Sequence, residues 1–530
     1  MKSPVLAPGE ILPLVRRIPG SPDPLALFGA LTGNAAGPDT LLLESADAAS
    51  GRGERSILLP RTMLRLEGRG STVRITPLTP NGMALRDWLA TVLVEDAAVR
   101  REGESLVAEW PGVPEGLESR ERLRAPGPLD ALRAVAHGIR LVSEPVALSH
   151  LAAGIFAYDL VDTQERLPPA RADLLDFPDF VFWIPEQIIV LDHVHPATTI
   201  LAHVVGGASD ASYNDAVRAI ESLARTVGEC RSTSKGVEGG VASTPFDTLR
   251  RPSTDLTDAE YADLVDRLRN HIIAGDVFQI VPSRTFTLPC DDPFAAYARL
   301  RAANPSPYMF LVRAPDFTLL GASPETAVQV TGRPRAVVLR PIAGTAPRGR
   351  TPGGCDDHEL DARLQAALMT DEKELAEHMM LVDLARNDVA RVSRPGTRRV
   401  SKLLTVDRYQ HVMHLVSEVT GELDAGLDAL HAYAASLNMG TLVGAPKVRA
   451  AQLLREHERS KRGPYGGAVG YLTRSGEMDT AIVIRSALVR DGVAHVRAGA
   501  GVVLDSDPVR EAEETRRKAM SVLQAVGFPA

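Results

Sequence analysis

The chain has 530 residues, 44% of them hydrophobic and 24% charged, and its 59 basic and 67 acidic residues give a net charge of −8. This length accommodates about two to four domains, and the acidic balance argues against binding to a nucleic-acid backbone. The three cysteines, Cys230, Cys290 and Cys355, fit neither a disulfide framework nor a zinc site. No signal-peptide core is present, and no uncharged apolar run reaches the roughly 20 residues of a membrane span. We therefore expect a cytoplasmic protein with neither nucleic acid nor membrane as a partner.

The elements predicted before residue 229 come from short apolar runs. Strands are predicted at 40–44, 55–59, 72–76, 187–192 and 198–205, and helices at 129–143 and 212–227. Residues 229–255 are rich in Ser, Thr, Gly and Arg and hold few large apolar residues, which is typical of a linker. We therefore divide the chain into an N-terminal domain at 1–228, a linker at 229–255 and a C-terminal domain at 256–530.

After the linker, Thr257 and Glu260 match a capping box that opens a helix, which Gly275 can end. Strands are predicted at 277–281, 317–320, 336–342, 481–489 and 494–504, and helices at 371–392, 426–437, 444–456 and 508–525. The last two strands are joined through Arg490, Asp491 and Gly492, which favours an antiparallel hairpin. The expected fold class is therefore mixed α/β, of the α+β kind.

Two of the predicted helices carry carboxylates three residues apart. Glu374 and Glu377 share one face of helix 371–392, and Glu511 and Glu514 repeat the spacing in helix 508–525. Mg²⁺ takes one or two protein carboxylates and fills its octahedron with water and substrate oxygens, so two such helices facing each other would make a site. The alternative is a pair of ordinary solvated helix faces, in which Glu514 pairs with Lys518.

Glycines and an arginine near the C-terminus indicate anion recognition. The AGAG run at 498–501 interrupts an apolar strand, so we expect either a bulge or a backbone that approaches a ligand. Arg485 lies between apolar neighbours, and its planar guanidinium suits a carboxylate, which belongs either to a ligand or to another residue of the protein.

Two further polar residues interrupt apolar runs. His414 is either a structural core histidine or a catalytic residue, and Glu325 is either a turn residue or a buried general acid. The sequence has no GxSxG, HExxH, Walker A or CxxC motif, and none of its cysteines lies in a glycine-flanked elbow. We therefore expect no glutamine-hydrolysing site in this chain.

Ten segments, taken in order, resemble the chorismate-utilising enzymes and most closely the anthranilate synthase component I branch. They are FQIVPSR (278–284), NPSPYMF (304–310), GASPE (321–325), PIAGTAPRGR (341–350), DEKELAEHMMLVDLARND (371–388), DRYQHVMHLVSEV (407–419), LNMGTLVGAPKVRA (437–450), YGGAVGY (465–471), DTAIVIRSA (479–487) and AGAGVVLDSDP (498–508). The N-terminal domain matches more sparsely, through LLLESA (41–46) and GIFAYDLVD (154–162). The resemblance implies a fold of packed antiparallel sheets with helices outside.

The same resemblance implies roles for individual residues. Glu377 and Glu514 match Mg²⁺ ligands, with Glu374 and Glu511 as nearby or water-mediated partners. Glu325 matches the acid that helps the C4 hydroxyl leave while ammonia adds at C2, His414 matches a residue of pyruvate elimination, and Thr441 lies near the same site. The positions that hold chorismate are matched by Gly344, Thr345, Tyr465, Arg485, Gly499, Ala500 and Gly501.

The LLLESA segment resembles the motif that binds tryptophan as a feedback inhibitor. It supplies Glu44 and Ser45, and NPSPYMF supplies Pro307, Tyr308 and Met309 on the other side of the inhibitor. A turn-capping role for Ser45 is the alternative.

Two positions separate the branches of the family. Isochorismate-forming relatives have a lysine where Gln279 stands, and many aminodeoxychorismate-forming relatives have a lysine nucleophile where Ala343 stands. The resemblance therefore implies a lyase that makes anthranilate and pyruvate from chorismate and ammonia in tryptophan biosynthesis. The implied ammonia source is a partner glutamine amidotransferase, in a heterotetramer. Aminodeoxychorismate synthase component I and an inactive regulatory scaffold remain the alternatives.

Overall fold

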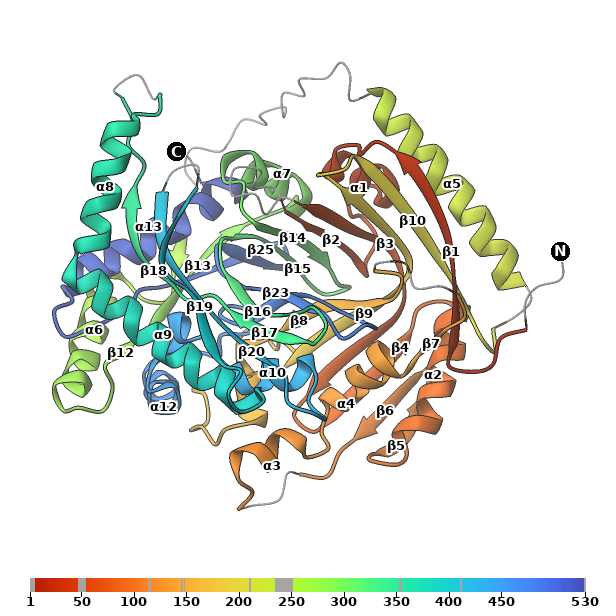
Figure 1. The fold of residues 1–530 in the computed structure, drawn as a ribbon, viewed down its shortest axis with the longest axis horizontal. Coiled ribbons are helices and arrows are strands. Elements are labelled where there is room, and N and C mark those ends of the chain that lie inside the picture. Colours follow the sequence, from red (N-terminus) through yellow and green to blue (C-terminus); the bar gives the residue numbers. More distant parts are fainter. Residues whose placement is uncertain are drawn as a thin grey trace.

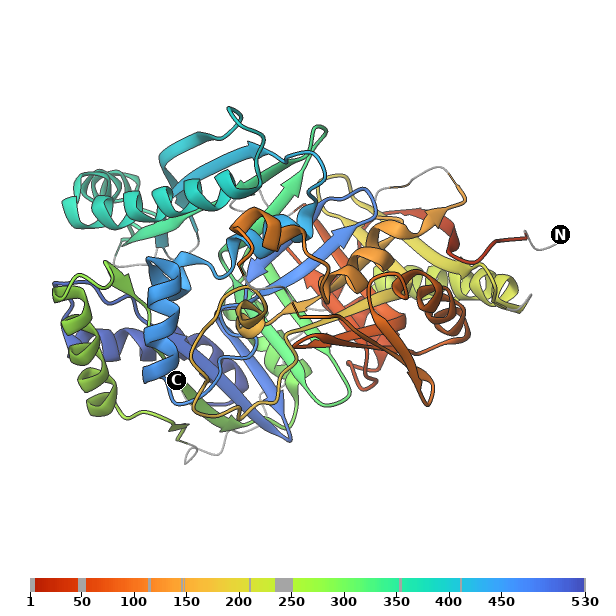
Figure 2. The ribbon, with the colours of Figure 1, turned by 90° about the horizontal axis from the view of Figure 1, so that it is seen from below.

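The computed structural model describes residues 5–45, 54–112, 116–143, 146, 148–208, 211–233, 251–351, 355–409 and 412–528. Most of the predicted linker and parts of two motifs, LLLESA and DRYQHVMHLVSEV, therefore lie outside the described residues. The strands occupy the middle of the molecule and the helices lie around them (Figures 1 and 2). None of the described helices is both long and apolar enough to cross a membrane.

One group of antiparallel strands comes from the N-terminal part of the chain. In order of hydrogen bonding, its core is β2 (Thr40–Glu44), β3 (Arg55–Arg69), β9 (Phe180–Asp192) and β8 (Leu151–Phe156). The group is extended at its sides by β10 (Ala197–Val205), β1 (Glu10–Pro19), β7 (Arg140–Leu141), β4 (Thr72–Pro77), β6 (Ser105–Glu109) and β5 (Ala98–Glu102). Of these, β7 pairs with β1 in parallel.

Two further groups of strands come from the C-terminal part and attach to opposite ends of this core. The first group begins where β14 pairs with β2, and it contains β14 (Tyr308–Arg313), β15 (Thr318–Ser323), β24 (Ser486–Arg490), β25 (Val493–Gly499), β13 (Ser283–Pro289) and β11 (Ser253–Thr254). The second begins where β22 pairs with β8, and it contains β22 (Ala468–Thr473), β23 (Met478–Ile482), β16 (Thr326–Thr331), β17 (Ala336–Leu339), β20 (Val412–Glu422), β18 (Ile342–Pro347) and β19 (Arg399–Arg408). The described N-terminal strands thus join two C-terminal arms. The short strands β12 (Gln279–Ile280) and β21 (Gly444–Ala445) pair separately.

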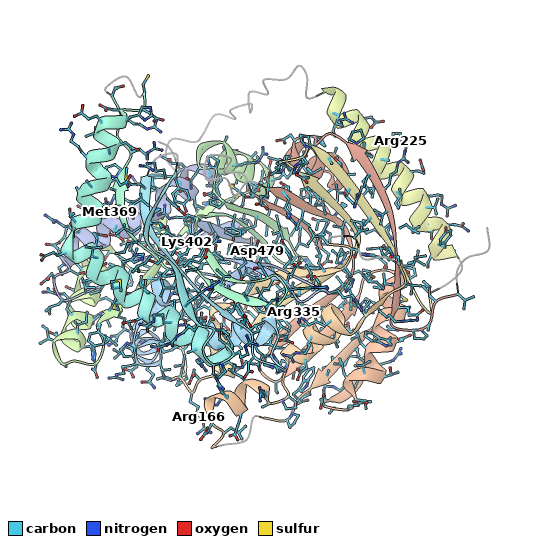
Figure 3. The ribbon with its side chains drawn as sticks, viewed as in Figure 1. Arg166, Arg225, Arg335, Met369, Lys402 and Asp479 are labelled. Atoms are coloured by element: carbon cyan, nitrogen blue, oxygen red, sulfur yellow. The ribbon has the colours of Figure 1, made fainter. Side chains whose placement is uncertain are left out.

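The helices begin where the sequence supplies caps. Thr257 and Glu260 form the predicted capping box of α6 (Asp258–Ile273), Asp371 caps α9 (Glu372–Val392), and Asp507 caps α13 (Pro508–Val526). The remaining helices are α1 (Pro24–Thr32), α2 (Pro80–Leu93), α3 (Ser119–Arg124), α4 (Leu129–Arg133), α5 (Ala211–Thr233), α7 (Pro293–Ala303), α8 (His358–Thr370), α10 (Ala429–Ser436), α11 (Gly440–Val443) and α12 (Lys447–His457). Figure 3 places Met369 of α8 and Arg225 of α5 at the periphery, and Asp479 of β23 near the middle.

The predicted mixture of helices and antiparallel sheets is confirmed, but several predicted strands are shortened or divided. The run 277–281 is reduced to β12, and the run 336–342 is divided because β17 ends at Leu339 and β18 begins at Ile342. The run 481–489 is divided between β23 and β24 because Arg485 adopts a φ of 50°, which ends the pleat between them. The expected strand 494–504 ends at Gly499. Between β24 and β25, Asp491 and Gly492 both have positive φ, as a tight two-residue hairpin turn requires, so the predicted hairpin is confirmed.

Candidate active site

Helices α9 and α13 bring the two predicted pairs of carboxylates together. The charges of Glu511 and Glu514 on α13 raise the pKa of Glu377 on α9, and Glu514 acts in the same way on Glu374. All four side chains are partly removed from water, and Glu514 also pairs with Lys518 at 2.7 Å, as the solvated-face alternative expects.

Burial and mutual repulsion make this acidic cluster receptive to a cation. Burial is the largest influence that raises the pKa of Glu374, Glu377 and Glu511. For Glu514 burial acts in the same direction, but Lys518 at 2.7 Å outweighs it and lowers the pKa. No three acidic, histidine or cysteine side chains among the described residues are already arranged to enclose an ion. Mg²⁺ needs only one or two such ligands when substrate and water supply the others, so the residues present fit it.

The segment Gly344–Thr345 lies directly against this cluster. A Cβ on Gly344 would lie 3.2 Å from Glu374 Oε2, and the Thr345 backbone N–H donates to the Glu374 carboxylate. On the other side, Thr345 Oγ1 is 2.9 Å from His414 Nδ1. Burial lowers the pKa of His414, and the positive charge of Arg485 lowers it further. His414 is therefore neutral at pH 7 and is held at the edge of the acidic cluster.

Glu325 lies in the two-residue link between β15 and β16, which joins the two strand arms. Its Oε1 accepts a 2.9 Å hydrogen bond from Thr441 Oγ1, and its backbone oxygen accepts one from Ile482 N–H. Burial raises the pKa of Glu325 to about 7, although the Thr441 hydrogen bond and the charge of Lys518 act in the opposite direction. A carboxyl group with this pKa can donate a proton near neutral pH.

Arg485 is available for an anionic ligand. Its guanidinium forms no ion pair or side-chain hydrogen bond within the described part of the chain, although it lies close enough to feel the charge of Glu514. Burial lowers the pKa of Arg485, because it removes the charged guanidinium from water. The prediction left open whether a protein carboxylate pairs with Arg485, and the structure provides no such direct pair among the described residues.

The glycines of 499–501 allow the backbone to approach its neighbours closely. A Cβ on Gly499 would lie 2.6 Å from the Pro282 oxygen and 3.2 Å from Tyr465 Oη, and one on Gly501 would lie 2.8 Å from Gln279 Nε2. Lys518 Nζ donates to the Gly499 oxygen at 3.1 Å. The loop is thereby fixed beside Tyr465 and Lys518, with Ala500 N–H bonded to the Pro282 oxygen.

A separate cavity of about 410 Å³ lies where β2 and β14 meet β23. All five residues predicted to contact the inhibitor line it, namely Glu44, Ser45, Pro307, Tyr308 and Met309. Glu44 is 5% exposed, and its carboxylate accepts hydrogen bonds from Tyr297 and Arg301, so this group is engaged within the protein. The cavity also contains Asp479, which accepts a 3.0 Å bond from the Tyr308 hydroxyl.

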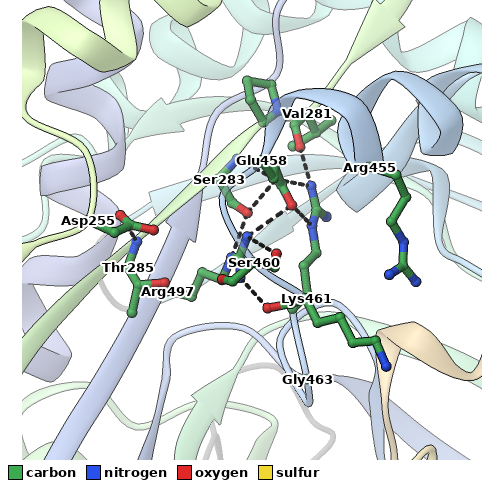
Figure 4. Close-up of polar contacts among 12 residues, drawn as sticks. Asp255, Val281, Ser283, Thr285, Arg455, Glu458, Ser460, Lys461, Gly463 and Arg497 are labelled. Atoms are coloured by element: carbon green, nitrogen blue, oxygen red, sulfur yellow. Dashed lines mark hydrogen bonds and ion pairs between the residues drawn. The ribbon is translucent and has the colours of Figure 1, made fainter. Parts of the chain in front are cut away.

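The sequence patterns did not indicate several polar residues around the site. Lys518 is more than a helix-surface partner of Glu514, because it also contacts Gly499 and influences Glu325. Glu458, Arg462 and Arg497 form a buried charged cluster that contacts Ser283 (Figure 4). The run of charged residues at 455–462 carried no periodic signal, and only the pairing of distant strands shows where these residues meet.

Comparisons with known proteins identify the family of the chain. The family model described as chorismate binding enzyme matches residues 110–524, which is well over half of the chain. The chain therefore belongs to the family of chorismate-binding enzymes.

Individual relatives show to which branch of this family the chain belongs. The chain is 48% identical over 493 residues to "Anthranilate synthase component 1, pyocyanine specific" of Pseudomonas aeruginosa, covering 93% of this chain and 90% of that protein. It is 45% identical over 506 residues to anthranilate synthase component 1 of Escherichia coli, covering 95% and 94%. The crystal structure of anthranilate synthase component I from Streptococcus pneumoniae superposes with a TM-score of 0.66 at 30% identity, covering 88% of this chain and 92% of that one. The chain belongs to the anthranilate synthase component 1 branch of the family.

Proposed function

We propose that this chain is the large subunit of an anthranilate synthase, which converts chorismate and ammonia to anthranilate, pyruvate and water. One observation carries the proposal: carboxylates from α9 and α13 converge beside Gly344–Thr345, with Arg485 unpaired by any described carboxylate. Chorismate carries two carboxylates, so a site with a cation-binding cluster and a free guanidinium matches its charges.

The residues around this cluster supply acid and base groups. Protonated Glu325 gives its proton to the C4 hydroxyl, which leaves as water while ammonia adds at C2. Thr441 holds the Glu325 carboxyl group through the 2.9 Å hydrogen bond. His414, whose pKa is lowered by burial, is neutral and takes part in the later loss of pyruvate that makes the ring aromatic.

Mg²⁺ would be held by Glu377 and Glu514, with Glu374 and Glu511 orienting its water molecules. When bound, it supplies neutralisation of the charge on the substrate carboxylate. The mutual repulsion of these partly buried carboxylates supports the assignment, because a divalent cation relieves it.

Two side chains favour anthranilate formation over the reactions that other branches of the family catalyse. Ala343 has no nucleophile, and its backbone oxygen contacts His378 Nδ1 at 3.1 Å. Gln279 is buried against Gly501 and cannot readily deprotonate water. Ammonia that arrives uncharged needs neither a lysine nucleophile nor a base for water.

The partner and the regulator are part of the same proposal. The chain has no glutamine-hydrolysing motif, so we propose that a glutamine amidotransferase subunit delivers the ammonia in a heterotetramer. We propose that tryptophan binds in the 410 Å³ cavity as a feedback inhibitor, supported by the five predicted contact residues that line it.

Product identification tests the reaction. The purified chain is incubated with chorismate, Mg²⁺ and ammonium, and the products are separated and compared with standards. Anthranilate and pyruvate in equal amounts support the proposal, whereas isochorismate or aminodeoxychorismate would replace it with another branch.

A further inference from the structure

We propose that Arg462 is a positioning residue of the active site: buried behind it, Arg462 locks together the three chain segments that bear Thr441, Tyr465 and the Gly499–Gly501 loop. This inference rests on the proposed function, because those segments form the chorismate site. Arg462 lies in the loop after α12. None of its described contacts is to the acidic cluster, and we do not assign it a role in binding the charges of the substrate.

The guanidinium of Arg462 is fully enclosed and uses four N–H bonds. Its side chain is 2% exposed. Nε and Nη2 donate to the two oxygens of Glu458 at 2.9 and 2.7 Å, which makes a bidentate ion pair. Nη1 donates to the Leu442 oxygen at 2.6 Å, and Nη2 also donates to the Val281 oxygen at 2.7 Å.

Each of these contacts reaches a segment of the active site. Leu442 follows Thr441, which binds Glu325. Val281 precedes Pro282, whose oxygen accepts from Ala500 N–H. The guanidinium carbon also lies 5.9 Å from the ring centre of Tyr465, whose hydroxyl is bonded to the backbone of Gly499. Arg462 is therefore a common fixed point for the backbone at 281–282 and at 441–442 and for its own segment, which bears Tyr465 three residues later.

Glu458 connects the same point to β13 and β25. It accepts from Ser283 N–H and Oγ at 2.9 and 2.7 Å, and from Arg497 Nη2 at 2.9 Å (Figure 4). Ser283 is the register partner of Gly499. The charges of Arg462 and Arg497 hold the pKa of Glu458 low despite its burial, so the carboxylate stays ionised. Its charge is therefore balanced by partners within the cluster.

The planar geometry of arginine is required for this role. A lysine at position 462 keeps the charge but has three donors on one nitrogen, which cannot reach Glu458, Leu442 and Val281 in the same directions. The expected consequence is a small displacement of Thr441 relative to Glu325 and Gly499. Misplacement by about 1 Å costs about 100-fold in rate, so a loss of kcat is expected with little effect on the charges that bind chorismate.

Arg455 provides a matched control. It is also a buried arginine, at 6% exposed, and it ends α12 in ion pairs with Asp159 and Asp162. Neither aspartate belongs to a substrate segment, although Asp159 also accepts a 2.8 Å hydrogen bond from Gly463 N–H, and in Figure 4 Arg455 lies apart from the Glu458 cluster. Arg455→Lys should therefore destabilise the fold without a specific effect on turnover.

The test compares Arg462→Lys with Arg455→Lys at a temperature where both are folded by circular dichroism. Arg462→Lys should lower kcat by about 10- to 100-fold and change KM for chorismate less than about three-fold, whereas Arg455→Lys should keep kcat within about two-fold. Adding Thr441→Val should cost far less in Arg462→Lys than in the wild type, because the two residues act through one contact. Equal kcat in the two lysine variants, or fully additive effects, would overturn the proposal.

A second variant keeps the test decisive if Arg462→Lys does not fold. Tyr158 lies under the guanidinium, with its ring centre 4.5 Å from the Arg462 carbon, and it touches none of the substrate segments through its hydroxyl. Tyr158→Leu should also lower kcat with little change in KM for chorismate, but by a smaller factor than Arg462→Lys. An unchanged kcat would contradict the proposal. Absence of turnover in the wild type would instead refute the proposed function.

Discussion

Thr441 donates a 2.9 Å hydrogen bond to Glu325 although the two residues are 116 positions apart in the chain. The bond joins α11 to the short link between β15 and β16, where the two strand arms meet. Burial is the largest influence on the Glu325 pKa, and this contact opposes it, so loss of the contact would raise that pKa.

The first prediction concerns the pH dependence of turnover. Glu325 must be protonated to act as the acid, so kcat/KM should fall as the pH rises through its pKa of about 7. Thr441→Val removes an interaction that lowers this pKa, so the fall should move to higher pH. The measurement is kcat/KM against pH at a constant concentration of free ammonia.

Thr198→Val is the matched control, since it removes another buried hydroxyl bond, to the Gly20 oxygen in the N-terminal part. Its pH profile should coincide with that of the wild type. A Thr441→Val profile that also coincides would show that Glu325 is not the titrating acid. Glu325→Gln should lower kcat by about 100-fold or more, which is the usual contribution of a general acid.

The second prediction concerns the metal. Glu377→Gln or Glu514→Gln should abolish turnover at low Mg²⁺ and remove any Mg²⁺-dependent rise in the thermal midpoint with chorismate present, because each change takes away a ligand charge. The exposed neighbour Glu513 provides the control, and Glu513→Gln should behave like the wild type in both measurements. Normal Mg²⁺ dependence in either of the first two variants would show that these residues belong to an ordinary solvated helix surface and are not metal ligands.

The third prediction concerns the 410 Å³ cavity. Ser45 lines it at the end of β2, so Ser45→Ala should weaken tryptophan binding by about 0.5–1.5 kcal/mol and raise the inhibitory concentration by a corresponding few-fold to about 10-fold. The effect is larger if a charged group of tryptophan loses its bond. Turnover without tryptophan should be unchanged, because Ser45 contributes to none of the substrate segments. Superimposed inhibition curves for the two proteins would make Ser45 a structural turn residue.

Local sequence signals predicted the helices of the site well and the strands less completely. The acidic caps and amphipathic spacing of 371–392 and 508–525 place α9 and α13 within one residue of the observed ends. Strand 481–489 was predicted as continuous because its apolar run is unbroken except at Arg485, and periodicity contains no sign of a left-handed residue. The site itself depends on pairings between distant strands, which no local pattern encodes.

The same limit applies to domain organisation and to the buried charges. The sequence divides at 229–255 by composition, yet β2 pairs with β14 and β8 pairs with β22, so described strands from both sides of that linker are hydrogen-bonded to each other. The division into 1–228, 229–255 and 256–530 therefore stays a prediction from the composition of the sequence. Arg462 and Glu458 are four residues apart and resemble an exposed helical ion pair in sequence, and only their burial beneath Tyr465 indicates another role.

The most direct test of the account measures anthranilate formation by the isolated, purified chain with two nitrogen sources. Fluorescence is followed with chorismate and Mg²⁺, in parallel with ammonium and with glutamine. The account predicts anthranilate from ammonium, equimolar pyruvate and no anthranilate from glutamine, because the chain holds acid, base and anion-binding groups but no amidotransferase nucleophile. Chorismate left unchanged with ammonium, or anthranilate formed from glutamine without a partner subunit, would contradict it.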